Sequence, residues 1–153
     1  MTIFQSLNTS ASALTSQRLR MDVISSNMAN IDTTRGKMVD GEWEPYRRKS
    51  VSFQPKEGQF SSMLNAAIGK TGNGSAGHGV TVSQITEDRE TPFTLVFNPS
   101  HPDSNEQGYV EMPNVDPLRE MVDLMSATRS YEANVTVLNA NKSMLMKALE
   151  IGK

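Results

Sequence analysis

Apolar side chains recur every seven residues near the start of the chain. The main series is Leu7, Leu14, Met21 and Met28, and the companion series is Ile3, Ile24 and Ile31. Because residues 3–31 contain neither Pro nor Gly, this spacing predicts one helix over that range with an a/d stripe on one face. Most other positions are Ser, Thr, Asn or Gln, which are mediocre helix formers. We therefore expect this helix to need a second helix against its stripe.

A second heptad pattern lies near the end of the chain. Its main series is Leu124, Tyr131, Leu138 and Leu145, and its companions are Met121, Thr128, Val135 and Leu149. Asp116 can cap a helix and Pro117 suits the first helical position, so the pattern predicts a helix over 117–151, roughly 52 Å long. That length is typical of a coiled coil. A further apolar stripe predicts more than one neighbour for this helix, at Val137, Met144, Ala148 and Ile151.

The middle of the chain contains every Pro other than Pro117 and every Gly other than Gly152. Short alternating runs at 43–53, 80–85 and 93–97 predict strands, and the Gly-rich run at 69–79 predicts a loop. The sequence therefore predicts a mainly α fold with a small β-rich middle, in which the long terminal helices pair as a coiled coil. The expected parts are an N-terminal helix over 1–31, a loop-rich β subdomain over 32–116 and a C-terminal helix over 117–153.

Composition narrows the possible functions. The chain has 153 residues, which is the size of one domain, and its net charge of −2 creates no field that would gather nucleic acid. It has no Cys, which excludes disulfides and thiolate chemistry. No apolar run is long enough to insert into a membrane, and the N-terminus lacks the pattern of a cleaved signal. Apolar residues make up 37%, so we expect a thin core that depends on partners for stability.

Candidate chemical motifs lack the context that catalysis would need. Residues 72–77 match G-x-G-x-x-G without a preceding strand and a following helix. Neither His78 nor His101 has further ligands at metal-site spacing, and the basic run at 47–49 stands alone. Glu42 and Glu44 could form a glycosidase pair, which keeps a peptidoglycan hydrolase as the enzymatic alternative. We predict no enzyme, no catalytic residue, no cofactor and no metal ion.

The two heptad helices themselves allow two interpretations. They could form one intramolecular hairpin that buries its own stripes. They could instead assemble with other chains, which the broad apolar face over 137–151 and the low apolar content favour. Residues Asn27, Asn30 and Asn134 lie near the stripes, where a buried Asn fixes register and an exposed one has no such role.

Two segments resemble a known family. Residues 26–34, S-N-M-A-N-I-D-T-T, resemble the A-x-N-x-A-N-x-x-T pattern of bacterial flagellar rod, hook and hook-associated proteins, and residues 129–134, R-S-Y-E-A-N, resemble their R-x-Y-E-A-N pattern. Further segments at 45–49, 98–103 and 108–117 resemble the proximal-rod members of this family. The chain departs from the pattern at 33–37, T-T-R-G-K, which lacks the usual Pro and aromatic residue.

The resemblance implies a structural subunit of the proximal rod, the axial drive shaft of the flagellar basal body. Its implied partners are other rod proteins, the motor-ring junction and the flagellar type III export apparatus, with no nucleic acid and no membrane insertion. Another flagellar axial or junction component is the alternative. The expected assembly interface comprises Leu7, Leu14, Met21, Ile24, Met28, Ile31, Asn27, Asn30, Met121, Leu124, Arg129, Tyr131, Asn134, Val135, Leu138, Leu145 and Leu149.

Overall fold

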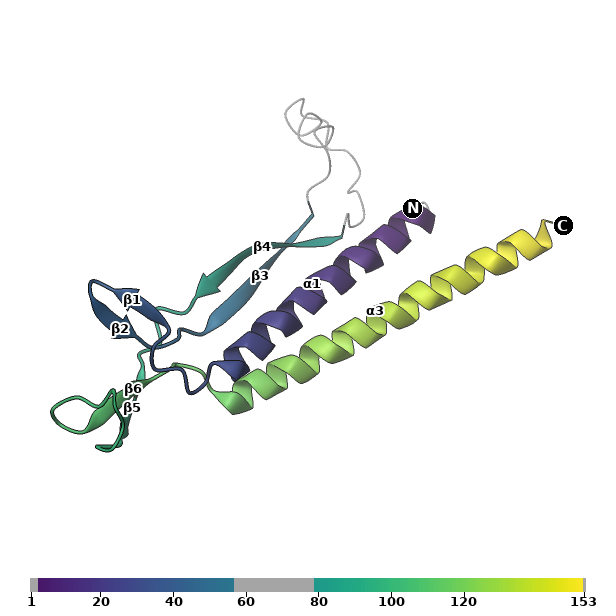
Figure 1. The fold of residues 1–153 in the computed structure, drawn as a ribbon. Coiled ribbons are helices and arrows are strands. Elements are labelled where there is room, and N and C mark those ends of the chain that lie inside the picture. Colours follow the sequence, from purple (N-terminus) through teal and green to yellow (C-terminus); the bar gives the residue numbers. More distant parts are fainter. Residues whose placement is uncertain (1–2, 57–78, 153) are drawn as a thin grey trace, which may run out of the picture. The chain divides into compact units, whose positions relative to one another are not determined.

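The computed structural model describes residues 3–56 and 79–152 (Figure 1). The Gly-rich run at 69–79, apart from Gly79, lies outside the described residues, as do the match to G-x-G-x-x-G and His78. Two long helices near the chain ends enclose a middle of short strands in the sequence. This arrangement confirms the predicted fold class, mainly α with a small β-rich middle.

Helix α1 spans Ile3–Ala29 and helix α3 spans Pro117–Ile151. The predicted ranges, 3–31 and 117–151, agree with these bounds to within two residues. The start of α3 is capped as its sequence indicates, because Asp116 Oδ1 accepts hydrogen bonds from the backbone N–H groups of Leu118 at 2.9 Å and Arg119 at 3.4 Å. None of the helices in the described ranges is long and apolar enough to cross a membrane.

Within residues 3–56 and 79–152, the strands form three separate two-stranded sheets, β1–β2, β3–β4 and β5–β6. Their bounds are β1 Lys37–Val39, β2 Glu42–Glu44, β3 Lys49–Pro55, β4 Val80–Glu87, β5 Thr94–Phe97 and β6 Tyr109–Met112. The predicted run at 43–53 is divided between β2 and β3, and the other two runs correspond to β4 and β5. Strands β1 and β6 were not predicted, because three or four residues show too little alternation to stand out.

Sheets β1–β2 and β5–β6 are antiparallel hairpins with defined register. In the first, Met38 pairs with Trp43, and Asp40 and Gly41 between the strands have φ angles of 52° and 92°. Positive φ at both positions is the geometry of a tight type I′ turn, which Asp-Gly sequences favour. In the second hairpin, Val96 pairs with Val110, and Val110 is buried. The opposite face of that hairpin carries Phe97, which is exposed.

Residue contacts divide the chain into two units. Unit 1 comprises Met1–Leu19, Ser52–Gln84 and Thr128–Lys153, and unit 2 comprises Arg20–Val51 and Ile85–Ala127. Each long helix therefore contributes one part to each unit, and so do β3 and β4. The three-part division expected from the sequence follows the types of element along the chain, and it stays a prediction.

The apolar core lies in unit 2. Among the described residues, the buried aliphatic side chains Val23, Ile24, Val110, Val115 and Ala127 all belong to this unit, as do the buried Pro45 and Pro113. The buried side chains of the described part of unit 1 are the small hydroxyls Ser10 and Ser16. There, Ser16 Oγ donates to the backbone oxygen of Val80 at 3.4 Å, and the N–H of Val80 donates to Ser12 Oγ at 3.1 Å. Two hydrogen bonds thus join α1 to β4 in unit 1.

Candidate assembly interface

The side chain of Asn27 is fully buried in unit 2, and its amide uses every donor and acceptor that it has. Nδ2 donates to the backbone oxygen of Lys49 at 2.8 Å and to Glu120 Oε2 at 3.0 Å. Oδ1 accepts from the backbone N–H of Lys49 at 2.9 Å and from the Tyr46 hydroxyl at 3.0 Å. Because it bonds both backbone groups of Lys49, Asn27 docks α1 onto β3 much as a neighbouring strand residue would.

Glu120 of α3 is also fully buried, and its charge is matched by Arg48. Arg48 Nε donates to Glu120 Oε1 at 2.5 Å, and Arg48 Nη2 lies 3.3 Å from Asp123 Oδ2. Arg20 of α1 donates to Asp123 Oδ1 at 3.0 Å. We call Asn27, Tyr46, Arg48, Lys49 and Glu120 the Asn27 lock. Removing one partner from such a buried charge pair typically costs about 3–5 kcal/mol.

The lock also sets the direction of the two helices inside unit 2. Arg20 bonds Asp123, and Asn27, seven positions further along α1, bonds Glu120, three positions earlier on α3. The end of α1 and the start of α3 therefore run antiparallel where they meet in this unit. This is the antiparallel pairing that a helical hairpin requires.

Arg48 itself is held by its backbone. Its N–H donates to Asn114 Oδ1 at 2.8 Å, and its carbonyl accepts from the N–H of Asp88 at 2.8 Å. Asn114, which is buried, also donates to the carbonyls of Asp88 at 3.0 Å and Thr91 at 3.1 Å. Hydrogen bonds from the backbone and hydroxyl of Thr91 lower the pKa of Asp88. These contacts hold the backbone of Arg48 so that its guanidinium points towards the helices.

A second polar tie joins the segment after α1 to the segment between β5 and β6. The Thr34 hydroxyl donates to Asp103 Oδ2 at 2.8 Å, and Arg35 Nε donates to Asp103 Oδ1 at 2.7 Å. The Arg35 hydrogen bond, followed by that of Thr34, lowers the pKa of Asp103. Arg35 lies in the stretch at 33–37 where the sequence departs from the family pattern.

The structure places the residues expected at the interface at three levels of exposure. Two are buried, Ile24 and Asn27. Twelve are half-buried: Leu7, Leu14, Met21, Met28, Asn30, Ile31, Leu124, Tyr131, Asn134, Val135, Leu138 and Leu145. Three are exposed: Met121, Arg129 and Leu149. Of these residues, the structure brings Asn27 to the centre of the lock.

The other two Asn residues near the stripes make local bonds. Asn30 Nδ2 donates to the backbone oxygen of Ser26 at 2.8 Å, and Asn134 Nδ2 donates to that of Ser130 at 2.8 Å. Both bonds reach back four residues, so they do not select a register between helices.

The lock partners of Asn27 were missed by the sequence analysis. The sequence places Tyr46, Arg48 and Lys49 in a segment that resembles the family and Arg48 in a short basic run, but it assigns no role to them or to Glu120. The sequence does contain a signal for Glu120. This residue lies seven positions before Ala127 and fourteen before Asn134, so the three share one face of the helix. That series was hidden because its members, unlike the Leu series beside it, are polar or small.

Apolar side chains on the solvent side of α3 form a second candidate surface. In unit 2, Leu118, Met121, Val122 and Met125 follow helical spacing and are more than half exposed. In unit 1, Val137, Met144, Met146, Leu149 and Ile151 are exposed, from 49% for Val137 to 86% for Ile151. Exposed apolar side chains in these two groups are candidate contacts for partners.

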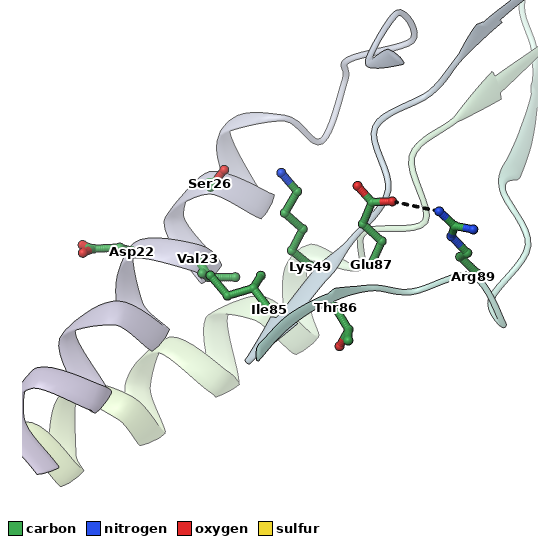
Figure 2. A pocket seen from close by; sticks show the side chains of 8 residues that line it. All are labelled: Asp22, Val23, Ser26, Lys49, Ile85, Thr86, Glu87 and Arg89. Atoms are coloured by element: carbon green, nitrogen blue, oxygen red, sulfur yellow. Dashed lines mark ion pairs between the residues drawn. The ribbon is translucent and has the colours of Figure 1, made fainter. Parts of the chain in front are cut away.

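A groove of about 710 Å³ lies between α1 and the β3–β4 sheet in unit 2. Figure 2 shows Val23 of α1 and Ile85 of β4 facing each other across it, with Lys49 beside them and Glu87 paired to Arg89 at 3.6 Å. Its lining has no His or Cys. In the described ranges, no cluster of three His, Cys, Asp or Glu side chains could hold a metal ion.

Glu44, one member of the Glu42–Glu44 pair of β2, is held in its charged form by an arginine. Glu44 accepts a hydrogen bond from Arg47 Nη2 at 2.7 Å, and this bond lowers the pKa of Glu44. A general acid needs a raised pKa near the working pH. Arg47 also lies over the ring of Phe93, 4.3 Å from its centroid, which fixes the arginine in place.

Comparison with known proteins decides the family. The family described as "Flagella basal body rod protein" matches residues 7–36, and the one described as "Flagellar basal body rod FlgEFG protein C-terminal" matches residues 106–151. The flagellar basal-body rod protein FlgC of Bacillus subtilis (strain 168) is 67% identical over 153 residues, covering 100% of both chains. The chain belongs to the FlgC family of flagellar basal-body rod proteins.

Two more distant FlgC proteins match over nearly the same length. That of Borreliella burgdorferi is 44% identical over 162 residues, covering 99% of this chain and 98% of its own. That of Salmonella typhimurium (strain LT2) is 41% identical over 153 residues, with both chains fully covered. As a FlgC-family member, the chain is a structural rod subunit of the flagellar basal body, where it assembles with other basal-body components. Asn27 and Glu120 lie inside the two matched segments, and Arg48 lies between them.

Proposed function

We propose that this chain is a non-enzymatic building block of the proximal rod, which joins copies of itself and other rod proteins through the apolar faces of α1 and α3. The observation that carries the proposal is the exposed apolar surface on α3, from Leu118 to Ile151. A helix of 35 residues with that much exposed apolar area is incomplete as a single chain. The residues named at the interface from the sequence, together with this surface, are the proposed contact set.

The geometry of such contacts suits an axial structure. A surface that meets a different surface on the next copy generates a tube or filament when the operation is a screw. Met side chains are flexible, so Met121, Met125, Met144 and Met146 can pack against unlike neighbours. A subunit at the motor-ring junction meets neighbours of more than one kind, which makes this adaptability useful.

Export by the flagellar type III apparatus fits the same features. Export requires that the chain can unfold. Helix α1 is rich in Ser, Thr, Asn and Gln, so it has little intrinsic helix stability. The core of five buried aliphatic side chains in the described residues is small for a chain of this length. A chain of this kind unfolds at low cost and regains stability from its neighbours.

No catalytic role is part of this proposal. The lowered pKa of Glu44 argues against this residue as the general acid of a glycosidase. Wall-lytic activity that is lost in Glu42→Gln would contradict this part of the proposal.

The test is incorporation into flagellar basal bodies, measured by quantitative mass spectrometry. The wild-type chain is expected in stoichiometric amounts with other rod proteins. Val137→Asp and Met144→Asp place a charge on the apolar face and are expected to reduce incorporation about tenfold or more. Asn139→Asp, at an exposed position beside that face, serves as the control and should incorporate normally. If the chain is absent from basal bodies and forms a stable monomer, a self-contained helical hairpin becomes the better account.

A further inference from the structure

The β5–β6 hairpin of unit 2 has one face turned towards the core and one turned away from it. Side chains alternate between the two faces along each strand, and buried Val110 marks the core face. The other face consists of two cross-strand pairs, Leu95 with Glu111 and Phe97 with Tyr109. Leu95 is 60% exposed, Phe97 63% and Tyr109 40%. We call these four residues the hairpin face.

The two aromatic rings of the hairpin face are held in place although solvent reaches them. Phe97 and Tyr109 meet edge to face, with 5.3 Å between the ring centroids. Gly108, at a φ angle of 81°, leaves the space that Phe97 fills, because a Cβ there would lie 2.9 Å from Cε2 of the ring. Asn105 Oδ1 accepts from the N–H of Tyr109 at 2.9 Å and closes the loop before β6. Aromatic side chains that are already ordered lose little conformational freedom on binding, which favours them as interface anchors.

A second exposed apolar face lies in the same unit, at the start of α3. Leu118, Met121, Val122 and Met125 are spaced by three, four and seven residues, so they share one side of the helix. Their exposed fractions range from 51% for Met121 to 73% for Leu118. We call these four residues the helix face. Met side chains adapt to the shape of a partner and make favourable contacts with aromatic rings, so the helix face suits an aromatic partner.

Each face also carries or adjoins a charge, and the two charges have opposite signs. Glu111 is exposed on the hairpin face, and Arg119 is exposed directly beside Leu118 at the edge of the helix face. Within residues 3–56 and 79–152, neither side chain has an ion-pair partner. Complementary charges beside two apolar faces favour pairing of one face with the other and select a single orientation.

We propose that the hairpin face of one subunit docks on the helix face of the next copy of this chain. Phe97 and Tyr109 pack on the Met side chains there, and Glu111 pairs with Arg119. Both faces are exposed in unit 2 of one chain, so neither is covered by the other within the subunit. A contact between two different faces passes from copy to copy in one direction, as in a ring or a helical array. The proposal rests on the proposed function and names what covers the start of α3.

The first test is chemical crosslinking between introduced thiols, because the wild-type chain has no Cys. Pairing of Glu111 with Arg119 brings their neighbours together, so Leu95→Cys and Leu118→Cys are introduced into one chain. Purified basal bodies are treated with a short bismaleimide crosslinker and analysed on a denaturing gel. The expected products are covalent dimers and larger multimers of this chain, since each copy carries both halves of the contact.

Three matched chains show whether the crosslink reports this contact. Leu95→Cys alone and Leu118→Cys alone should each remain monomeric in mass, since neither chain carries both halves. Leu95→Cys with Asn139→Cys, an exposed position of α3 in unit 1, should also give no multimers. The proposal is overturned if the Leu95→Cys, Leu118→Cys chain gives only monomers, a link within one chain, or no more multimers than this control.

Exchange of the two charges tests whether the partner is a second copy. Glu111→Arg and Arg119→Glu are each expected to lower incorporation into basal bodies about fivefold, because each brings like charges together. The double variant should return to within about twofold of the wild type. Recovery requires that both charges belong to the same kind of chain, because a different partner would keep its own charge. Double-variant incorporation that stays as low as that of the single variants overturns the proposal.

Two controls separate this proposal from the proposed function. Glu106→Arg, at an exposed position in the loop between β5 and β6, should incorporate normally. Urea midpoints of the purified monomers should match the wild type, because the substituted charges are exposed. If Glu111→Arg and Arg119→Glu incorporate normally while Val137→Asp does not, the docking contact is wrong and the proposed function stands. If the wild-type chain is itself absent from basal bodies, both proposals are wrong.

Discussion

The two units of this chain stabilise the same pair of helices by different means. Unit 2 surrounds the end of α1 and the start of α3 with apolar side chains and a saturated polar network. In unit 1, the hydroxyls of Ser12 and Ser16 bond α1 to β4, and the apolar side chains Leu7 and Leu14 are only half-buried. A helix that is continuous in secondary structure need not be continuous in stability, because local opening follows burial and contact density. Uneven stability along the helices is useful for a subunit that is exported and then assembled.

The largest expected effect comes from the buried carboxylate of unit 2. Glu120→Ala leaves Arg48 and Asn27 Nδ2 without their partner, and the free energy of unfolding should fall by about 3–5 kcal/mol. Urea denaturation of the full-length monomer measures this fall in unfolding free energy. Glu132→Ala, at an exposed position of α3 in unit 1, is the control and should stay within about 0.5 kcal/mol. Similar losses in the two variants would remove the distinction between the units.

A smaller effect is expected from the apolar core. Val110→Ala removes two methyl groups from a side chain that is 2% exposed, which should cost about 2 kcal/mol in unfolding free energy. Val137→Ala, on the exposed face of α3 in unit 1, should cost less than about 0.5 kcal/mol in the monomer. The same variant is also tested in basal bodies. Val137→Ala should lower incorporation into basal bodies while leaving the unfolding free energy of the monomer nearly unchanged. The reverse result would place Val137 in the monomer's own core.

Substitution of two glycines with positive φ tests whether α1 is docked against the segment that contains Gly79. A Cβ at Gly79, φ 97°, would collide with Ser12 Oγ of α1, whereas a Cβ at Gly41, φ 92°, meets nothing within 4 Å. Gly41→Ala therefore reports backbone strain alone, about 1 kcal/mol. If residues 3–19 are open in the monomer, Gly79→Ala costs no more than Gly41→Ala in urea denaturation. A clearly larger cost for Gly79→Ala would show that this part of α1 is already docked.

The smallest expected effect is a pH dependence at the tie between Arg35 and Asp103. Folding lowers the pKa of Asp103, chiefly through the hydrogen bond from Arg35, so its contribution is present above the unfolded pKa and is lost as pH falls through the folded pKa. Stability should therefore drop slightly more for the wild type than for Asp103→Asn between pH 7 and about pH 3. A carboxyl titration of Asp103 by NMR that shows a pKa at or above that of a free aspartate would contradict this.

Much of the fold was predictable because its signals are local. The seven-residue spacing of Leu and Met side chains indicated both helices, and Asp116-Pro117 indicated the start of α3 to the residue. Strands β1 and β6 were missed because each is stabilised by its hairpin partner rather than by its own pattern. The family was also recognisable, since its two motifs stand at the two helices in the expected order.

The candidate site was predictable only in part. The apolar stripes named half-buried positions such as Leu124 and Leu138, and a register-setting Asn was one of the two interpretations that the sequence left open. Which Asn has that role was not decided by spacing, because Asn30 and Asn134 stand in similar contexts, yet their side-chain amides donate to backbone oxygens four residues earlier. The exposed positions Leu118 and Val122 of α3 were also missed, since they fall outside both heptad series.

The sequence by itself determined the elements that depend on near neighbours: two long helices, a turn-rich middle and membership of a flagellar axial family. Only the tertiary structure determined which residues form the Asn27 lock. Glu120 meets Asn27 across 93 positions of the chain and Arg48 across 72. Periodicity reports which face of a helix is apolar, because that follows from the geometry of consecutive residues. It carries no information about which buried carboxylate meets which amide, because that depends on the path of the chain between them.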